Sequence, residues 1–241
     1  MMYDLAHFAL SDMTRCGREL RKLGADASSL EQVADRTVRF LHDSLRVSDG
    51  SRACGLVRFF LTMPYSDLEP EQQRFVRGLI GAEVAPPTMK CLTLMATVGE
   101  MPAWNSRRTS SGHGALPLAS AESVARSPMI AQLISQLGVE VASLITPEKN
   151  FLVDAEQHSF NVFHVPEAKG SPYIPAQDEF VTPHGIRSVL GFGGLLPSGE
   201  LFAAVLFSKC PIGRETADRF KPLALNAKVA ILPFVGGKIF A

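Results

Sequence analysis

The residues with the clearest capacity for chemistry lie in a long polar segment near the middle of the chain. Residues 107–114 read Arg-Arg-Thr-Ser-Ser-Gly-His-Gly. This combination places cations, hydroxyls and flexible glycine backbone next to one another, which are the ingredients of an anion-binding cradle. A solvated surface loop has the same composition, and both interpretations stay open. The enclosing segment, 100–118, has no apolar period, and loops of this length are usually either functional or disordered.

A second group of candidates combines aromatic and imidazole side chains from separate parts of the sequence. Trp104 is the only tryptophan, and His113 lies in the same polar segment. His164 falls on a predicted strand, Tyr173 follows a Gly-Ser-Pro turn, and Phe192 lies in an apolar run. Burial of an indole contributes about 2 kcal/mol or more, so we predict that Trp104 folds inward. Its loop then forms the lid of a ligand pocket shared with the other four residues. A core histidine at 164 and a tryptophan that only pins its loop are the structural alternatives.

The cysteines lack the spacing of a metal or disulfide motif, and no metal site is expected. They are Cys16, Cys54, Cys91 and Cys210. Cys54 and Cys91 lie in predicted apolar strands, where a thiol is an inert small hydrophobe, and a redox role is the alternative. Cys210 precedes Pro211, so haem ligation by Cys210 or by His164 is an alternative to an ordinary strand exit. The sequence contains no known catalytic motif, and we therefore predict no enzyme.

Composition and charge exclude several classes of protein. The 24 basic and 24 acidic residues leave no net charge that would attract nucleic acid or anionic lipid. No apolar run reaches the about 18 residues of a membrane span, and the first residues do not resemble a signal peptide. Unpaired cysteines suit a reducing compartment. We therefore expect a cytoplasmic protein with neither a nucleic-acid nor a membrane partner.

The elements that position these residues follow from periodicity and turn residues. Apolar spacings of three and four predict helices over residues 5–23, 29–45, 70–80, 127–137 and 214–232. Short apolar runs predict strands over residues 53–63, 89–98, 139–145 and 160–165, with a hairpin over 188–208 and a helical turn over 175–181. Ser29 and Gln32 form a capping box, and Pro222 predicts a kink or a late start of the last helix. Glycines in the hairpin predict a β-bulge or a close approach to the backbone: Gly191, Gly193 and Gly194. Helices mixed with antiparallel strands indicate an α+β architecture in a single domain, residues 1–241.

The hairpin carries a resemblance to a known family. Residues 184–190 read His-Gly-Ile-Arg-Ser-Val-Leu, and residues 195–207 read Leu-Leu-Pro-Ser-Gly-Glu-Leu-Phe-Ala-Ala-Val-Leu-Phe. With the helix from residue 214, this pattern resembles the last hairpin and terminal signalling helix of the GAF family of small-molecule sensory domains, over residues 29–232. The chain is also similar to N-terminal input modules of bacterial PAS and histidine-kinase signalling proteins. The resemblance implies a central antiparallel sheet of five or six strands flanked by helices.

The resemblance implies a function in signal transduction. A GAF-like sensory module binds a small ligand or a partner and relays a conformational change through its terminal helices to an output domain or kinase. The family's cyclic-nucleotide motif, Asn-Lys-Phe-Asp, and its bilin-attaching cysteine are absent, so the resemblance implies neither of these ligands and leaves the cofactor unknown. A GAF-like thiol-dependent reductase of methionine sulfoxide and a structural dimerisation domain without a ligand are the two alternatives.

The first 24 residues are expected to form an N-terminal amphipathic signalling or dimerisation helix. One stripe of this helix is apolar and lies outside the part that resembles the family, which predicts a homodimer through that stripe. Packing back onto the chain's own sheet is the alternative. The stripe consists of Leu5, Ala9, Met13, Cys16, Leu20 and Leu23.

Overall fold

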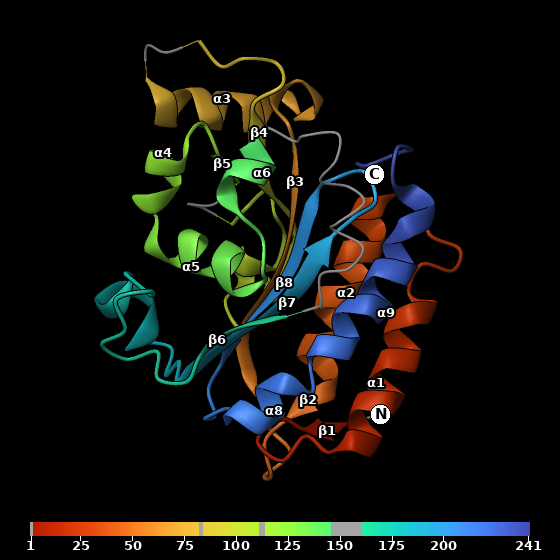
Figure 1. Ribbon diagram of the computed structural model, residues 1–241. Helices are drawn as coiled ribbons and strands as arrows, with labels where there is room; N and C mark the ends of the chain where they lie inside the picture. Colours follow the sequence, from red (N-terminus) through yellow and green to blue (C-terminus); the bar gives the residue numbers. More distant parts are fainter. Residues whose placement is uncertain (1, 82–83, 111–113, 146–160) are drawn as a thin grey trace.

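A six-stranded antiparallel sheet forms the centre of the structure, a computed structural model that describes residues 2–81, 84–110, 114–145 and 161–241 (Figure 1). The strand order is β5-β4-β3-β8-β7-β6. In the middle of the sheet, β3, its first strand in the sequence, pairs with β8, its last. The strands are β3 (Cys54–Pro64), β4 (Lys90–Gly99), β5 (Ala115–Pro117), β6 (Val162–Val165), β7 (Ser188–Leu195) and β8 (Leu201–Ser208). A separate parallel pair joins β1 (Tyr3–Asp4) to β2 (Leu45–Arg46).

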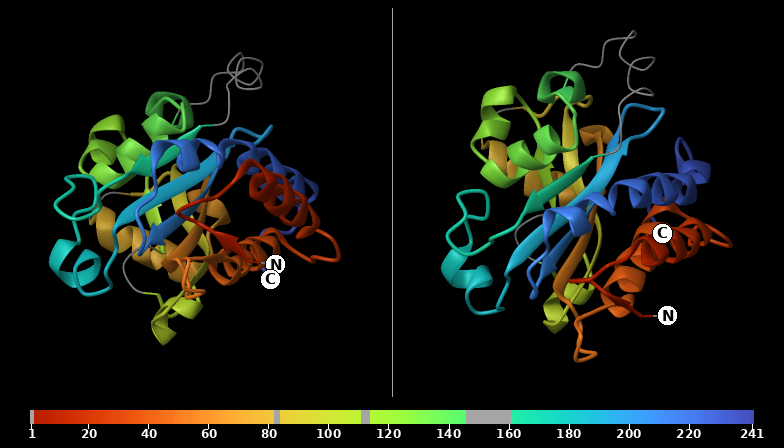
Figure 2. Two further views of the ribbon diagram at one scale, coloured as in Figure 1. Left: turned by 90° about the horizontal axis from the view of Figure 1, so that it is seen from below. Right: turned by 60° about the horizontal axis from the view of Figure 1, so that its bottom comes forward.

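Helices cover both faces of the six-stranded sheet (Figures 1 and 2). On one face, α2 and α9 pack on the strands and α1 packs on α9; we call this the α2/α9 face. The opposite face is covered by α4, α5 and α6, and we call it the α4–α6 face. The longer helices are α1 (Leu10–Lys22), α2 (Leu30–Ser44), α3 (Pro70–Ile80), α5 (Pro128–Gln136) and α9 (Lys221–Ile231). The shorter ones are α4 (Ala121–Ala125), α6 (Val141–Ile145) and α8 (Arg214–Asp218). None of the helices in the described ranges has both the length and the apolarity needed to cross a membrane.

The central strands are apolar on both faces because each face is covered. Along β3, Val57 and Phe59 point into the core of the α2/α9 face, whereas Leu56 and Phe60 point into the core of the α4–α6 face. This alternation follows from the two-residue period of a strand. A side chain of β3 therefore belongs to one of two separate cores, and its position in the strand decides which.

Local sequence signals account for where the main helices begin. The side chain of Ser29 accepts a hydrogen bond from the Gln32 N–H at 3.2 Å, which caps α2 at the predicted position. The Gln32 side chain reaches back to the N–H of Ser28, at 2.7 Å, one residue earlier than a capping box requires. The helix predicted over residues 214–232 is divided into α8 and α9. Pro222 lies in the first turn of α9, which is the late start predicted at this proline.

Two predicted elements are corrected by the structure. Residues 139–145, predicted as a strand, contain the short helix α6 instead. The helix predicted from residue 5 begins at Leu10, because the preceding residues form the strand β1 and then a turn, in which the N–H groups of Ala6 and His7 donate to Oδ1 of Asp4. Within the predicted loop 100–118 the structure also contains β5 and a 3-10 turn at Pro102–Asn105.

The apolar stripe of α1 is used inside the molecule. Cys16 and Leu20 are fully buried and lie in the same core as α9. Gly17 lets the two helices approach closely, since a Cβ there would lie 2.7 Å from Nδ2 of Asn226. The prediction that this stripe forms a dimer interface is therefore wrong, because the chain's own last helix covers it.

The glycines of the hairpin do not form a bulge. The register of β7 and β8 is continuous from Ser188 opposite Ser208 to Leu195 opposite Leu201. At Gly193 a Cβ would lie only 2.1 Å from the carbonyl oxygen of Phe202. The close approach predicted here is confirmed, and the group that approaches is the backbone of β8.

Candidate functional site

A single cation is buried in the middle of β3. Arg58 lies between Leu56 and Phe60 in the strand's alternation, so its side chain belongs to the α4–α6 face, and it is only 8% exposed. Burial lowers the pKa of Arg58 to about 10, which still leaves the guanidinium charged at neutral pH. Charged side chains are seldom this buried unless polar groups surround them.

Two hydroxyl groups lie beside this cation. Thr97 of β4 is directly opposite Arg58, and residues opposite each other in an antiparallel pair share one face of the sheet. Thr97 is 1% exposed, and its Oγ1 has no hydrogen-bond partner among the described residues. Ser110, from the polar segment after β4, is 7% exposed, and its Oγ accepts a hydrogen bond from Nη2 of Arg58 at 3.0 Å. We call Arg58, Thr97 and Ser110 the Arg58 cluster.

The row of side chains that crosses the sheet from this cluster is apolar. Arg58 is opposite Val205 of β8, which is opposite Gly191 of β7, which is opposite Phe163 of β6. Above this row lies α5, whose Leu133 Cδ1 would be 3.3 Å from a Cβ on Gly191. The α4–α6 face therefore places hydrogen-bonding groups at one end of a row and apolar groups at the other.

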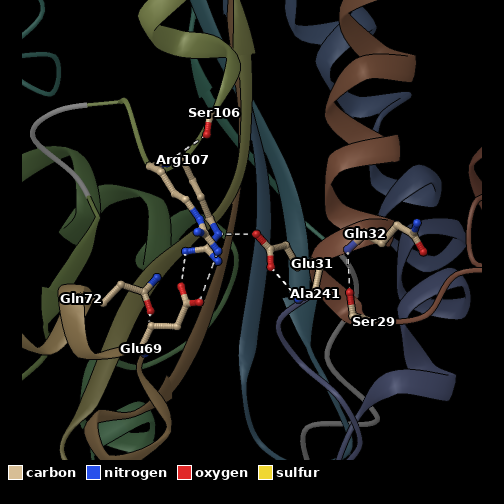
Figure 3. Close-up of polar contacts among 9 residues, drawn as sticks. Ser29, Glu31, Gln32, Glu69, Gln72, Ser106, Arg107 and Ala241 are labelled. Carbon is tan, nitrogen blue, oxygen red and sulfur yellow. Dashed lines mark hydrogen bonds and ion pairs between the residues drawn. The ribbon is translucent and has the colours of Figure 1, made fainter.

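Arg107 holds the polar segment in place and does not form an open anion cradle (Figure 3). Its Nε lies 2.5 Å from Oε1 of Glu31, and its Nη1 lies 2.6 Å from Oε2 of Glu69. The ring of Phe240 lies against the guanidinium, at 5.0 Å from its centroid. The neighbouring Arg108 is 64% exposed and 3.7 Å from Glu69. Carboxylates already neutralise the charge of Arg107. Of the described cradle residues, 107–110 and 114, Ser110 joins the Arg58 cluster.

Two of the predicted pocket residues lie on the α2/α9 face. His164 shares the face of Val162, and its Nε2 donates a hydrogen bond to the carbonyl oxygen of Ile212 at 2.9 Å. Burial lowers the pKa of His164, although that hydrogen bond acts in the opposite direction. Phe192 is fully buried on the same face and contacts the ring of Phe220 at 5.8 Å. Both residues therefore belong to the core, and His164 is a core histidine whose Nε2 has a hydrogen-bond partner.

The other predicted pocket residues lie elsewhere. Trp104 is half-buried against the core of the α4–α6 face, with its ring 5.6 Å from that of Phe180 and 4.6 Å from that of His184. Tyr173 is 39% exposed. His113 lies outside the described residues. Because the sheet separates Trp104 from His164 and Phe192, the single pocket predicted for these residues is not formed among those described.

All four cysteines are free and buried. Burial raises the pKa of Cys16 and of Cys91 to about 12, and it also raises the pKa of Cys54 and of Cys210. The Sγ of Cys210 lies 3.3 Å from Oγ of Ser208, so this thiol contacts the last residue of β8. Among the described residues, no three His, Cys, Asp or Glu side chains gather as a metal-binding group.

Comparison with known proteins shows a similarity of fold. No known family profile and no curated protein sequence matches it. Its structure is similar to that of free methionine-R-sulfoxide reductase from Neisseria meningitidis in complex with its substrate, with a TM-score of 0.50 at 10% identity over 98% of both chains. The GAF domain of a phosphoenolpyruvate-protein phosphotransferase from Acinetobacter matches at a TM-score of 0.43, with 13% identity over 93% of this chain and 95% of that domain. The corresponding domain from Coxiella burnetii matches at 0.44, with 15% identity over 94% and 98%. With a six-stranded antiparallel sheet between two helical layers, the chain has a GAF-like α+β fold.

Proposed function

We propose that this chain is a sensory module that binds a small ligand at the Arg58 cluster and relays its binding to an output domain or kinase. One observation carries the proposal: Thr97 presents a hydroxyl that is 1% exposed and has no partner among the described residues. A buried hydroxyl left unpaired costs about 1 to 3 kcal/mol. A ligand that hydrogen-bonds to Thr97 offsets this cost only when it is bound, as expected of a sensor.

The neighbours of Thr97 indicate the chemistry of the ligand. Arg58 donates hydrogen bonds, and the hydroxyls of Thr97 and Ser110 both donate and accept them, so the cluster suits an oxygen of a carboxylate or carbonyl group. The apolar row from Val205 to Phe163 is buried beneath α5, so a hydrocarbon body bound beside it would displace α5. We therefore propose a small organic acid or carbonyl compound with an apolar portion.

The test compares two isosteric variants on the same strand. Thr97→Val removes the unpartnered hydroxyl, whereas Thr93→Val removes a hydroxyl on the α2/α9 face that donates to the Cys91 carbonyl at 3.2 Å. Native mass spectrometry of the purified protein, with thermal shifts in acetate, octanoate and phenylacetate, reports binding. We expect a bound mass or a saturable shift that weakens about tenfold in Thr97→Val and stays unchanged in Thr93→Val. Equal binding by both variants, or no binding by the wild type, contradicts the proposal.

The second candidate is a thiol-dependent reductase, because a solved structure with the same fold is a reductase. The thiolate is the reactive form of cysteine, and a raised pKa reduces its population at neutral pH. The buried thiols with raised pKa values described above therefore favour a binding module over thiol chemistry. Because these thiols are unpaired, we also propose that the module works in the cytoplasm.

We also propose that the chain forms a homodimer and folds as a single domain. The interface would have to use a surface other than the stripe of α1 that includes Cys16 and Leu20, since α9 covers that stripe. Sedimentation equilibrium of the wild type tests the dimer, and a single monomeric species over a wide concentration range contradicts it.

A further inference from the structure

The last residues of the chain cap the start of α2. The N–H of Leu30 donates to the carbonyl of Lys238 at 3.1 Å, and the N–H of Glu31 donates to that of Ile239 at 2.8 Å. The N–H groups of a helix's first turn have no partner within the helix, so these bonds satisfy groups that would otherwise need water. The N–H of Ala241 in turn donates to Oε2 of Glu31 at 2.8 Å (Figure 3). We call residues 235–241 the C-terminal strap.

Arg107 fastens this strap to the rest of the molecule. Its guanidinium touches three segments at once: Glu31 in α2, Glu69 at the start of α3, and the ring of Phe240 in the strap. The side chain is 7% exposed, so these pairs are shielded from water. Burial acts to raise the pKa of Glu31, but hydrogen bonds from Arg107 and from the Ala241 N–H outweigh it and hold that pKa below its ordinary value. Glu31 therefore stays ionised while Arg107 and the strap are in place.

A short hydrogen-bonded turn links Arg107 to the Arg58 cluster. The N–H groups of Thr109 and Ser110 both donate to the carbonyl of Ser106, at 3.2 and 3.0 Å. Thr109 Oγ1 also donates to the Ala103 carbonyl at 2.9 Å. Residues 106–110 are thus one turn, with Arg107 near one end and Ser110 at the other. Arg107 and Ser110 therefore lie on the same hydrogen-bonded unit.

We propose that this turn couples the Arg58 cluster to the docking of the C-terminal strap. The strap is docked when Ser110 is held by Arg58 and Arg107 is held between Glu31 and Glu69. Loss of the Ser110 contact shifts the strap toward release, and release of the strap loosens Ser110 by the same free energy, since coupling is reciprocal. The coupling is a property of the chain itself and goes beyond the proposed function, because it exists whether or not a ligand binds.

Amide hydrogen exchange of the whole chain measures strap docking directly. The N–H groups of Leu30 and Glu31 are protected by the strap's carbonyls, so their exchange reports its release. We expect Arg107→Gln to speed exchange at these two amides by about tenfold. The matched control is Arg108→Gln, which makes the same charge change at the next, exposed residue and should leave exchange at both amides as in the wild type.

The coupling itself is tested at Ser110. Ser110→Ala removes the contact with Arg58 without touching the strap, and it should speed exchange at Leu30 and Glu31 by about threefold or more. Thr93→Val, a buried change on the other face, should not. Unchanged exchange in Arg107→Gln overturns the role of Arg107 as fastener, and equal exchange in Ser110→Ala and Thr93→Val overturns the coupling. Protected amides of β3 and β8 confirm that each variant is folded. None of these outcomes depends on finding a ligand, so they are separable from a failure of the proposed function.

Discussion

The hydroxyl of Thr97 makes no hydrogen bond within the described part of the structure. Thr97→Val keeps the shape of the side chain and removes that hydroxyl, so we expect the free energy of unfolding to stay unchanged or to rise by about 1 kcal/mol. Thr93→Val should instead lower it by about 1 kcal/mol, because Thr93 loses its bond to the Cys91 carbonyl. Urea unfolding measures both values. A marked loss of stability in Thr97→Val would mean that Thr97 supports the fold and is not kept for a ligand.

His42 makes stability depend on pH. It is 2% exposed on α2, its Nε2 has no partner among the described residues, and burial, followed by the charge of Arg52, lowers its pKa below 6.5. The unfolded chain therefore binds a proton that the folded chain does not, in the window between the folded pKa and 6.5. His42 contributes stability above pH 6.5 that is lost as the pH falls through the folded pKa.

The variant His42→Leu should flatten this acid-side loss of stability between pH 7 and about pH 5. At pH 7 its free energy of unfolding should equal or exceed that of the wild type, since an apolar side chain replaces an unsatisfied buried one. Leu79→Ala, at a residue 52% exposed on α3, removes no titratable group, so it is the control and should keep the wild-type slope. Chemical denaturation across this pH range gives the slopes, and equal slopes in all three proteins would refute the assignment.

The cluster at Arg58 could be found only in part from the sequence. A lone charge in the apolar run over residues 53–63 is a visible signal, because such a run is otherwise compatible with burial on both faces. Ser110 lies within the segment predicted as an anion cradle. The pairing of Arg58 with Thr97 depends on the register of β3 against β4, including a shift between Phe59 and Phe60, and periodicity within one strand does not fix that register.

At the scale of elements, the predictions from the sequence are correct where a few adjacent residues determine the element. The Ser29 cap, the late start of α9 and the two strands of the hairpin are each specified by a few adjacent residues. Residues 139–145 were misassigned because a short apolar run fits a strand or a buried helical turn equally well, and contacts with α4 and α5 select the helix. The stripe of α1 was recognised as apolar, but its partner lies about two hundred residues away in α9, which no local pattern reveals.

Gly193 tests the close packing of the hairpin. Gly193→Ala would bring a Cβ to 2.1 Å from the Phe202 carbonyl, and neither backbone can yield without disturbing the ladder, so we expect a loss of about 1 to 3 kcal/mol or more in the free energy of unfolding. Gly78 in α3 has nothing within 4 Å of its Cβ position, and Gly78→Ala should raise stability by about 0.5 to 1 kcal/mol. Thermal or urea unfolding of the two variants measures both changes in stability. A neutral Gly193→Ala would contradict the register of β7 and β8.

Leu20 tests the packing of α1 on α9. It is fully buried in the core shared with Leu223 and Ala227, so Leu20→Ala should lower the free energy of unfolding by about 2 to 5 kcal/mol without changing the sedimenting mass. Leu79→Ala, at a residue 52% exposed on α3, should change stability by less than about 0.5 kcal/mol. A dissociation of dimers in Leu20→Ala without loss of stability would restore the stripe as an interface.

At the scale of the whole molecule, the four thiols report how the structure opens. Cys16 lies in α1, Cys54 and Cys91 lie in the sheet, and Cys210 follows β8, so together they sample the outer helix and the core. Because all four are buried, a thiol reagent at neutral pH should label none of them at the rate of a free cysteine. The rate for Cys54 and Cys91 should follow global unfolding as urea is added, and full denaturation should release four thiols. Faster labelling of Cys16 alone would show that α1 opens separately from the sheet, as a terminal signalling helix must. Rapid labelling of Cys54, Cys91 or Cys210 in the native protein would instead favour the thiol-dependent reductase over the binding module.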